Sequence, residues 1–255
     1  MFLYTVVFIF GALIGSFLNV CIYRIPLGRS IVYPGSFCPL CRKKIPWYLN
    51  IPIISYVLLQ GKCRYCSCPI SIRYPVVEAL TGFFAAALVF KFSLSFEAVF
   101  WFVFTAFLVV ISFIDLDHQI IPDSLSLPGT AIFASSFYFV PEMRLMDSLT
   151  GILAGGGLLY AVALLYYIIR KQDGMGGGDI KLLAMIGAAA GVKGVLFTVF
   201  AGSVLGTIAG AAVMTAGKNI NYRLKIPFGP FLSCGAVLYI FQGPELIQWY
   251  FGILA

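Results

Sequence analysis

FLYTVVFIFGALIGSFLNVCIY, residues 2–23, is an apolar segment that contains no charged side chain. Its length reaches the roughly 20 residues that an α-helix needs to cross a hydrocarbon core of about 30 Å. The segment lacks the basic start and the small-residue cleavage pattern of a secretory signal, and the first positive charge, Arg24, follows it. We therefore expect a retained transmembrane helix whose N-terminus lies outside the cytoplasm.

The rest of the chain is equally apolar. Hydrophobic residues make up 61% of the 255 residues and charged residues only 11%, which is more apolar surface than one soluble core can bury. We expect an all-α polytopic membrane protein with about eight transmembrane helices and both termini outside. The predicted spans are 2–22, 75–92, 98–114, 124–140, 148–169, 180–192, 195–216 and 231–250.

Positive charge is distributed unevenly over the predicted loops. The loops 23–74, 115–123, 170–181 and 217–230 hold fourteen of the seventeen Lys and Arg residues, and Lys91, Arg144 and Lys193 are the other three. Loops rich in Lys and Arg face the cytoplasm, so these four are predicted to be cytoplasmic. This topology and anionic lipid explain the net charge of +7, and we expect no nucleic-acid partner.

Four cysteines in the long loop 23–74 have metal-ligand spacing. CPLC (Cys38, Cys41) and CRYC (Cys63, Cys66) form a C-x2-C, 21 residues, C-x2-C pattern, which is typical of a zinc ribbon with a closed structural site. A metal would stabilise a loop that is rich in proline and glycine and too small for its own core. Disulfides and unligated thiols are the alternatives, although cytoplasmic thiols stay reduced. Cys68 is a spare that could replace Cys66.

Carboxylates cluster at two helix ends that are predicted to share the cytoplasmic face. FIDLDHQIIPD, residues 113–123, offers Asp115, Asp117 and Asp123, and GMGGGDIK, residues 174–181, offers Asp179. Two carboxylates in a restricted-solvent site divide into a general base and a general acid, which is the chemistry of aspartic proteases. Helix capping by the same residues explains the pattern equally well. His118 could titrate near neutrality, but a lone loop histidine is more often a bystander.

Several motifs in order along residues 10–235 resemble those of the bacterial type IV prepilin peptidases: GSFLNVCIYRIP (15–26), the two C-x2-C pairs, ISIRYPVVE (70–78), IDLDHQIIPD (114–123), GMGGGDIKLLAM (174–185) and IPFGPF (226–231). GxGD also occurs in presenilin-like proteases, but their tyrosine-aspartate motif is absent here. The resemblance implies a bifunctional enzyme of the bacterial inner membrane with its active sites facing the cytoplasm. Such an enzyme would cleave the basic leader from type IV prepilins or type II secretion pseudopilins after a glycine, and would then N-methylate the new N-terminal residue, typically phenylalanine.

The resemblance also implies residue roles. The two catalytic aspartates of the family fall on Asp115 and Asp179, which would hold the attacking water between them. S-adenosylmethionine would be the methyl donor, and Asn19, Arg24, Arg73 and Glu78 lie where the N-terminal motifs of the family lie. Glu78 also fits a plain first-turn charge. Residues 1–92 would then be the methyltransferase-associated part and 93–255 the peptidase part.

A transporter with an intramembrane aspartate pair is the alternative from another functional class. That alternative predicts inverted repeats, which the sequence lacks, and leaves the four cysteines unexplained. An inactive pilus-assembly protein with the same fold would not need both acids.

Overall fold

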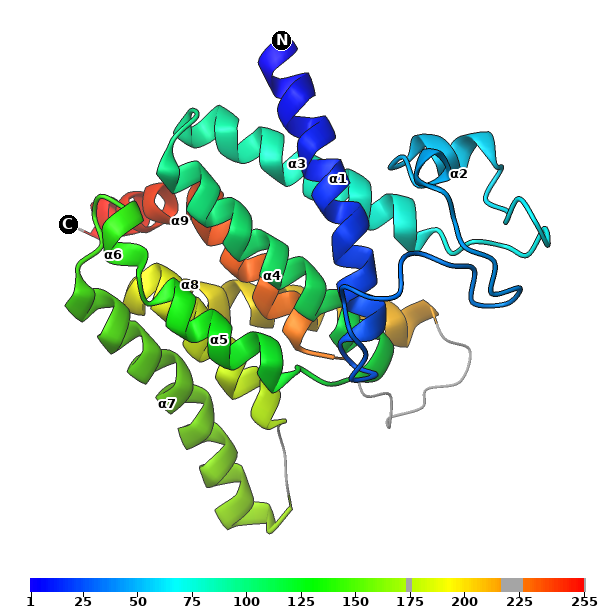
Figure 1. The fold of residues 1–255 in the computed structure, drawn as a ribbon. Coiled ribbons are helices and arrows are strands. Elements are labelled where there is room, and N and C mark those ends of the chain that lie inside the picture. Colours follow the sequence, from blue (N-terminus) through cyan, green and yellow to red (C-terminus); the bar gives the residue numbers. More distant parts are fainter. Residues whose placement is uncertain (173–175, 217–226, 255) are drawn as a thin grey trace. The chain divides into compact units, whose positions relative to one another are not determined.

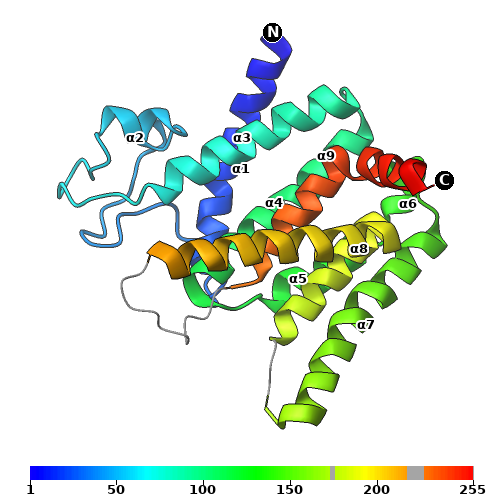
Figure 2. The same ribbon diagram turned by 180° about the vertical axis from the view of Figure 1, so that it is seen from behind.

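The computed structural model describes residues 1–172, 176–216 and 227–254, and the regular elements in these ranges are helices (Figures 1 and 2). The prediction of an all-α membrane protein is confirmed. The first part of the GMGGGDIK motif, and portions of the predicted loops 170–181 and 217–230, lie outside the described residues.

Five of the described helices are long and apolar enough to cross a membrane. They are α1 (Phe2–Arg24), α3 (Arg73–Phe92), α4 (Phe96–His118), α7 (Leu145–Arg170) and the Gly177–Thr215 part of α8 (Gly177–Ala216). The predicted span 124–140 is instead two shorter helices, α5 (Asp123–Phe133) and α6 (Ser136–Phe139). The last helix is α9 (Gly229–Leu254). Eight separate spans are therefore not established by length and composition alone.

The chain divides into two compact units, Met1–Val110 and Ile111–Ala255. In the first unit, α1 and α3 pack closely against each other. Small residues allow this approach, because a Cβ atom on Gly15 would lie 2.8 Å from the Cα atom of Glu78. The contact brings the polar residues of the two helices together.

The loop between α1 and α3 contains two similar turns around its cysteine pairs. In the first turn, Cys38 N–H donates to Lys43 O at 3.0 Å, and in the second Cys63 N–H donates to Cys68 O at 2.8 Å. An isolated antiparallel bridge closes each turn, Phe37 with Lys44 and Lys62 with Pro69. A 3-10 helix, η1 (Trp47–Leu49), and a short helix, α2 (Ile54–Leu58), lie between them.

In the second unit, α8 packs against α5, α7 and α9. The helix bends at Gly191, whose φ of +67° and ψ of −173° are not helical, and Figure 2 shows the change of direction. The predicted spans 180–192 and 195–216 put this break two to three residues later. The buried hydroxyls of Ser136 and Ser148 both donate to Ala188 O, at 3.0 and 2.9 Å. They stabilise a carbonyl just before the bend, where the regular helical hydrogen bonds are interrupted.

Candidate active site and metal centre

Asp115 lies in the last turn of α4 and is only 5% exposed. Its Oδ2 atom accepts a hydrogen bond of 3.0 Å from the N–H of Gly229, the first residue of α9. The free N–H groups and the dipole at a helix N-terminus favour a negative charge there. A Cβ atom at position 229 would lie 2.6 Å from the same oxygen, so the contact requires a glycine.

Asp179 lies in the first turn of α8, because that helix begins at Gly177. It is therefore inside the helix, and its N–H donates to Gly176 O at 3.2 Å. Asp179 is half-buried and interacts electrostatically with Asp115. The structure thus places the two acids that the resemblance selects near each other: Asp179 lies in the first turn of α8, and the Asp115 carboxylate, at the end of α4, lies at the N-terminus of α9.

Ile121 lies between two glycines of this site. A Cβ atom on Gly178 would lie 2.9 Å from Ile121 Cβ, and one on Gly229 would lie 3.3 Å from Ile121 Cδ1. The glycine before Asp179 therefore permits a close approach to the segment after α4. An ion pair also joins the segments: Lys181 Nζ donates to Asp123 Oδ1 at 2.6 Å. Both side chains of the pair are exposed, so it contributes at most about 1 kcal/mol.

Asp117 and His118 lie outside this arrangement. Both side chains are exposed at the end of α4, whereas Asp115 is buried. Residues two apart on a helix point in different directions, so α4 can direct only one of its two aspartates at Asp179.

The sulfur atoms of Cys38, Cys41, Cys63 and Cys66 all lie within 4.8 Å of one another. Four thiolates around a zinc ion at about 2.3 Å have neighbouring sulfurs about 3.8 Å apart. The Cys38 and Cys66 sulfurs are separated by this distance, 3.8 Å. The four cysteines therefore fit a tetrahedral zinc site.

Cys68 is a fifth cysteine beside this cluster, with its sulfur 3.2 Å from Cys66 and 3.6 Å from Cys38. The hydrogen bonds of the two turns show whether Cys66 or Cys68 is equivalent to Cys41. Cys68 O accepts the Cys63 N–H in the same way that Lys43 O accepts the Cys38 N–H. Cys66 therefore occupies the position of Cys41, and Cys68 occupies that of Lys43.

The first thiol of each pair is prepared for metal binding. A backbone hydrogen bond at Cys41 lowers the pKa of Cys38 to about 6. Backbone hydrogen bonds at Tyr65 and Cys66 lower the pKa of Cys63. Thiolates are the metal-binding form of cysteine, so these hydrogen bonds favour the charged ligand at Cys38 and at Cys63, whereas the pKa values of Cys41 and Cys66 are raised to about 11.

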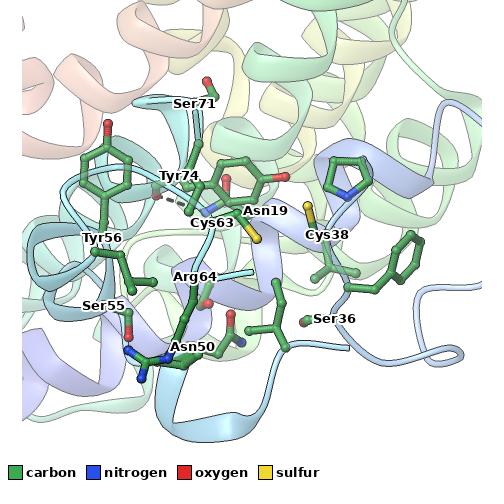
Figure 3. A pocket seen from close by; sticks show the side chains of 18 of the residues that line it. Asn19, Ser36, Cys38, Asn50, Ser55, Tyr56, Cys63, Arg64, Ser71 and Tyr74 are labelled. Carbon is green, nitrogen blue, oxygen red and sulfur yellow. Dashed lines mark hydrogen bonds between the residues drawn. The ribbon is translucent and has the colours of Figure 1, made fainter. Parts of the chain in front are cut away.

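A cavity of about 410 Å³ lies between the cysteine loop and the facing ends of α1 and α3. Its lining includes all four residues that the resemblance assigns to the methyl-donor part: Asn19, Arg24, Arg73 and Glu78. Figure 3 shows Asn19 at this cavity, beside Tyr74, Cys38 and Cys63. The structure brings these residues together although the sequence contains no recognisable S-adenosylmethionine pocket.

The cavity residues differ in how their polar atoms are used. Arg24 is 6% exposed and donates to Ser30 O and Gly35 O, at 3.0 and 3.3 Å, so its guanidinium holds the loop that follows α1. Glu78 Oε2 accepts the N–H of Ile53 at 2.7 Å. Ile53 has a φ of +62°, which is strained for a β-branched residue.

Sequence reasoning did not identify Gly229, Ile121 and Ile53. Gly229 belongs to IPFGPF, a motif that supports the resemblance but contains no side chain that could act as an acid, a base or a nucleophile. Ile121 belongs to IDLDHQIIPD, in which the aspartates are the candidate catalytic residues and the isoleucines carry no such signal. Nothing in the sequence around Ile53 indicates a backbone donor to a distant carboxylate.

The helices and the acid pair define a class, namely multi-pass membrane proteins in which two aspartates at helix ends lie close enough to repel each other. The chain belongs to the type IV leader peptidase family, whose model matches residues 102–211. A second model, the bacterial peptidase A24 N-terminal domain, matches residues 9–92.

Curated relatives cover most of the chain. A protein of Neisseria gonorrhoeae is 36% identical over 88% of this chain and 85% of its own length. A protein of Xanthomonas campestris is 34% identical over 94% of this chain and 91% of its own length, and one of Pseudomonas aeruginosa is 34% identical over 94% and 90%. All three are named prepilin leader peptidase/N-methyltransferase. No solved structure matches the chain.

Proposed function

We propose that this chain is a prepilin leader peptidase and N-methyltransferase of the bacterial inner membrane. It cleaves the basic leader from a type IV prepilin or a type II secretion pseudopilin after a glycine, and it methylates the new N-terminus. The observation that carries the proposal is that the buried Asp115 lies close enough to Asp179 for the two carboxylates to repel each other, in a chain that belongs to the type IV leader peptidase family.

Asp115 and Asp179 are the proposed catalytic residues. A water molecule between them attacks the scissile carbonyl while one carboxylate accepts its proton and the other donates a proton to the leaving amine. Gly229 N–H orients Asp115 for this role through its hydrogen bond to Oδ2. No covalent intermediate forms, since water is the nucleophile.

S-adenosylmethionine is the proposed methyl donor, and the cavity beside the cysteine loop is its proposed location. Asn19, Arg73 and Glu78 line this cavity, which is large enough for a ligand of that class. Arg24 lines it too, but its hydrogen bonds to Ser30 O and Gly35 O support a loop-holding role. Zinc on Cys38, Cys41, Cys63 and Cys66 would hold the loop that forms one wall.

Eight spans with both termini outside are the proposed topology. Four spans are the helices α1, α3, α4 and α7, and the bend at Gly191 divides α8 into two more. The helices α5 and α6 together form the seventh span, and α9 forms the eighth. Both acid-bearing helix ends and the cysteine loop then face the cytoplasm, where Lys and Arg are concentrated. None of the comparisons supports the transporter alternative.

Product analysis tests the function. The full chain, purified in detergent or placed in liposomes, is incubated with a prepilin, and the products are identified by mass spectrometry. We expect cleavage after one glycine without a methyl donor, and a gain of one methyl group on the new N-terminus when S-adenosylmethionine is added. An uncut prepilin under these conditions would contradict the peptidase assignment.

A further inference from the structure

Glu78 is a buried carboxylate without a positively charged partner among the described residues. It is 7% exposed, and its hydrogen bonds come from the N–H of Ile53 and the side chain of Ser16. A carboxylate offers roughly four acceptor positions, so these two donors leave part of it unused. Burying a charge without a counter-ion is costly, and an acid in a membrane helix therefore indicates a functional site.

Asn19 provides a second unused acceptor in the same cavity. Its side chain is 2% exposed, and its Nδ2 atom donates to Gly15 O at 3.3 Å and to Tyr74 O at 3.1 Å. Its Oδ1 atom is buried and has no hydrogen-bond partner. A buried acceptor without a donor loses free energy unless a ligand supplies one.

The close packing of α1 on α3 places both residues in the lining of the same cavity. Asn19 is bonded to Gly15, and Gly15 lies against the backbone of Glu78. One negative charge and one neutral acceptor match a ligand that has a positive charge and several N–H donors. A primary ammonium group has both properties.

We propose that Glu78 and Asn19 bind the terminal ammonium of the methyl acceptor, the N-terminus of the mature pilin. This inference rests on the proposed function and specifies where one substrate of the methyl transfer lies. It assigns Glu78 and Asn19 to the acceptor rather than to the methyl donor.

The position of the two residues favours the acceptor. Asn19 and Glu78 belong to helices that are apolar and long enough to span a membrane, so a chain lying along these helices can deliver its end to them. The cavity wall beside them contains Val20, Ile51 and Ile53, which suit an apolar first side chain. S-adenosylmethionine also carries an ammonium group and is the other possible source.

Binding measurements distinguish the two sources. A fluorescent peptide with the mature pilin N-terminus is titrated against the full chain in detergent, first with a free amine and then N-acetylated, without a methyl donor. Binding of S-adenosylmethionine is measured separately by calorimetry. The variant Glu78→Gln removes the charge but keeps an acceptor for Ile53 N–H. The matched control is Glu142→Gln, which removes an exposed carboxylate.

We expect the wild-type protein to bind the free-amine peptide about tenfold more tightly than the acetylated one, the difference expected for a charge-assisted hydrogen bond. Glu78→Gln should abolish this preference and leave S-adenosylmethionine binding unchanged. Asn19→Leu should reduce the preference in the same direction. Glu142→Gln should change the affinity for neither the peptide nor S-adenosylmethionine.

Three results would overturn the inference. The first is a Glu78→Gln variant that keeps the amine preference, and the second is one that loses affinity for S-adenosylmethionine instead. The third is a wild-type protein without the preference. Prepilin cleavage, measured on the same samples, reports on folding and on the peptidase separately. A protein that cleaves but shows no amine preference therefore refutes this subsite and leaves the peptidase proposal intact.

Discussion

Asp115 and Asp179 depend on neighbouring glycines that cannot accept a side chain. Gly229 lies against the Asp115 carboxylate, and Gly178 lies against Ile121 on the chain segment between α4 and α5. The sequence GMGGGDIK gives no reason to distinguish its three consecutive glycines. The structure distinguishes Gly177 from Gly178. A Cβ atom on Gly177 would meet nothing within 4 Å, whereas one on Gly178 would lie 2.9 Å from Ile121 Cβ.

Gly178→Ala should therefore reduce cleavage, and Gly177→Ala should not. The added methyl group at 178 would lie 2.9 Å from Ile121 Cβ, and relieving such a clash costs about 1–3 kcal/mol and displaces Asp179. We expect an initial cleavage rate at least about tenfold lower for Gly178→Ala. Initial rates on a prepilin test this, and equal rates for the two variants would contradict the contact.

Local patterns could predict part of the site. The positions of the acids at helix ends and the spacing of the cysteines are readable from the sequence. The choice between Asp115 and Asp117 required a family resemblance, because their difference in burial depends on distant contacts such as Gly229. The cavity required the structure for the same reason, since Asn19 and Glu78 meet only when α1 packs on α3.

The bend in α8 depends on one glycine within the helix, Gly191. Sequence hydropathy predicted two spans with a break near residue 193, and the structure places the break at Gly191. A conformation with φ of +67° and ψ of −173° is nearly restricted to glycine. The helix therefore bends where glycine permits it and where Ser136 and Ser148 supply hydrogen bonds to Ala188 O.

Gly191→Ala should destabilise the protein by about 1–3 kcal/mol, the cost of forcing an L-residue into this conformation. Gly157→Ala is the control, because a Cβ atom there would meet nothing within 4 Å inside α7. The free energy of unfolding of both variants can be measured in mixed detergent micelles. A Gly191→Ala protein as stable as the control would show that the bend does not need this glycine.

The assignment of the zinc ligands in the two cysteine turns can also be tested. The purified protein should contain one zinc ion per chain. Cys66→Ser should lose it, because Cys66 occupies the position equivalent to Cys41, and Cys68→Ser should retain it. Metal content by mass spectrometry distinguishes the variants. Zinc retained in Cys66→Ser and lost from Cys68→Ser would reverse the ligand assignment.

The two proposed activities belong to different compact units of the chain. The cysteine loop and the cavity lie within Met1–Val110, and Asp115 and Asp179 lie within Ile111–Ala255. The family models divide the chain similarly, at residues 9–92 and 102–211. Substitutions in one unit should therefore affect one activity and spare the other.

The most direct measurement compares prepilin cleavage and methyl transfer to precleaved pilin in the wild type and in Asp115→Asn, Asp179→Asn and Asp117→Asn. We predict that Asp115→Asn and Asp179→Asn each abolish cleavage and retain methyl transfer, and that Asp117→Asn, which changes an exposed acid, retains both. Cleavage at the wild-type rate by Asp115→Asn or Asp179→Asn would contradict the account, because Asp115 and Asp179 would then not be the catalytic pair.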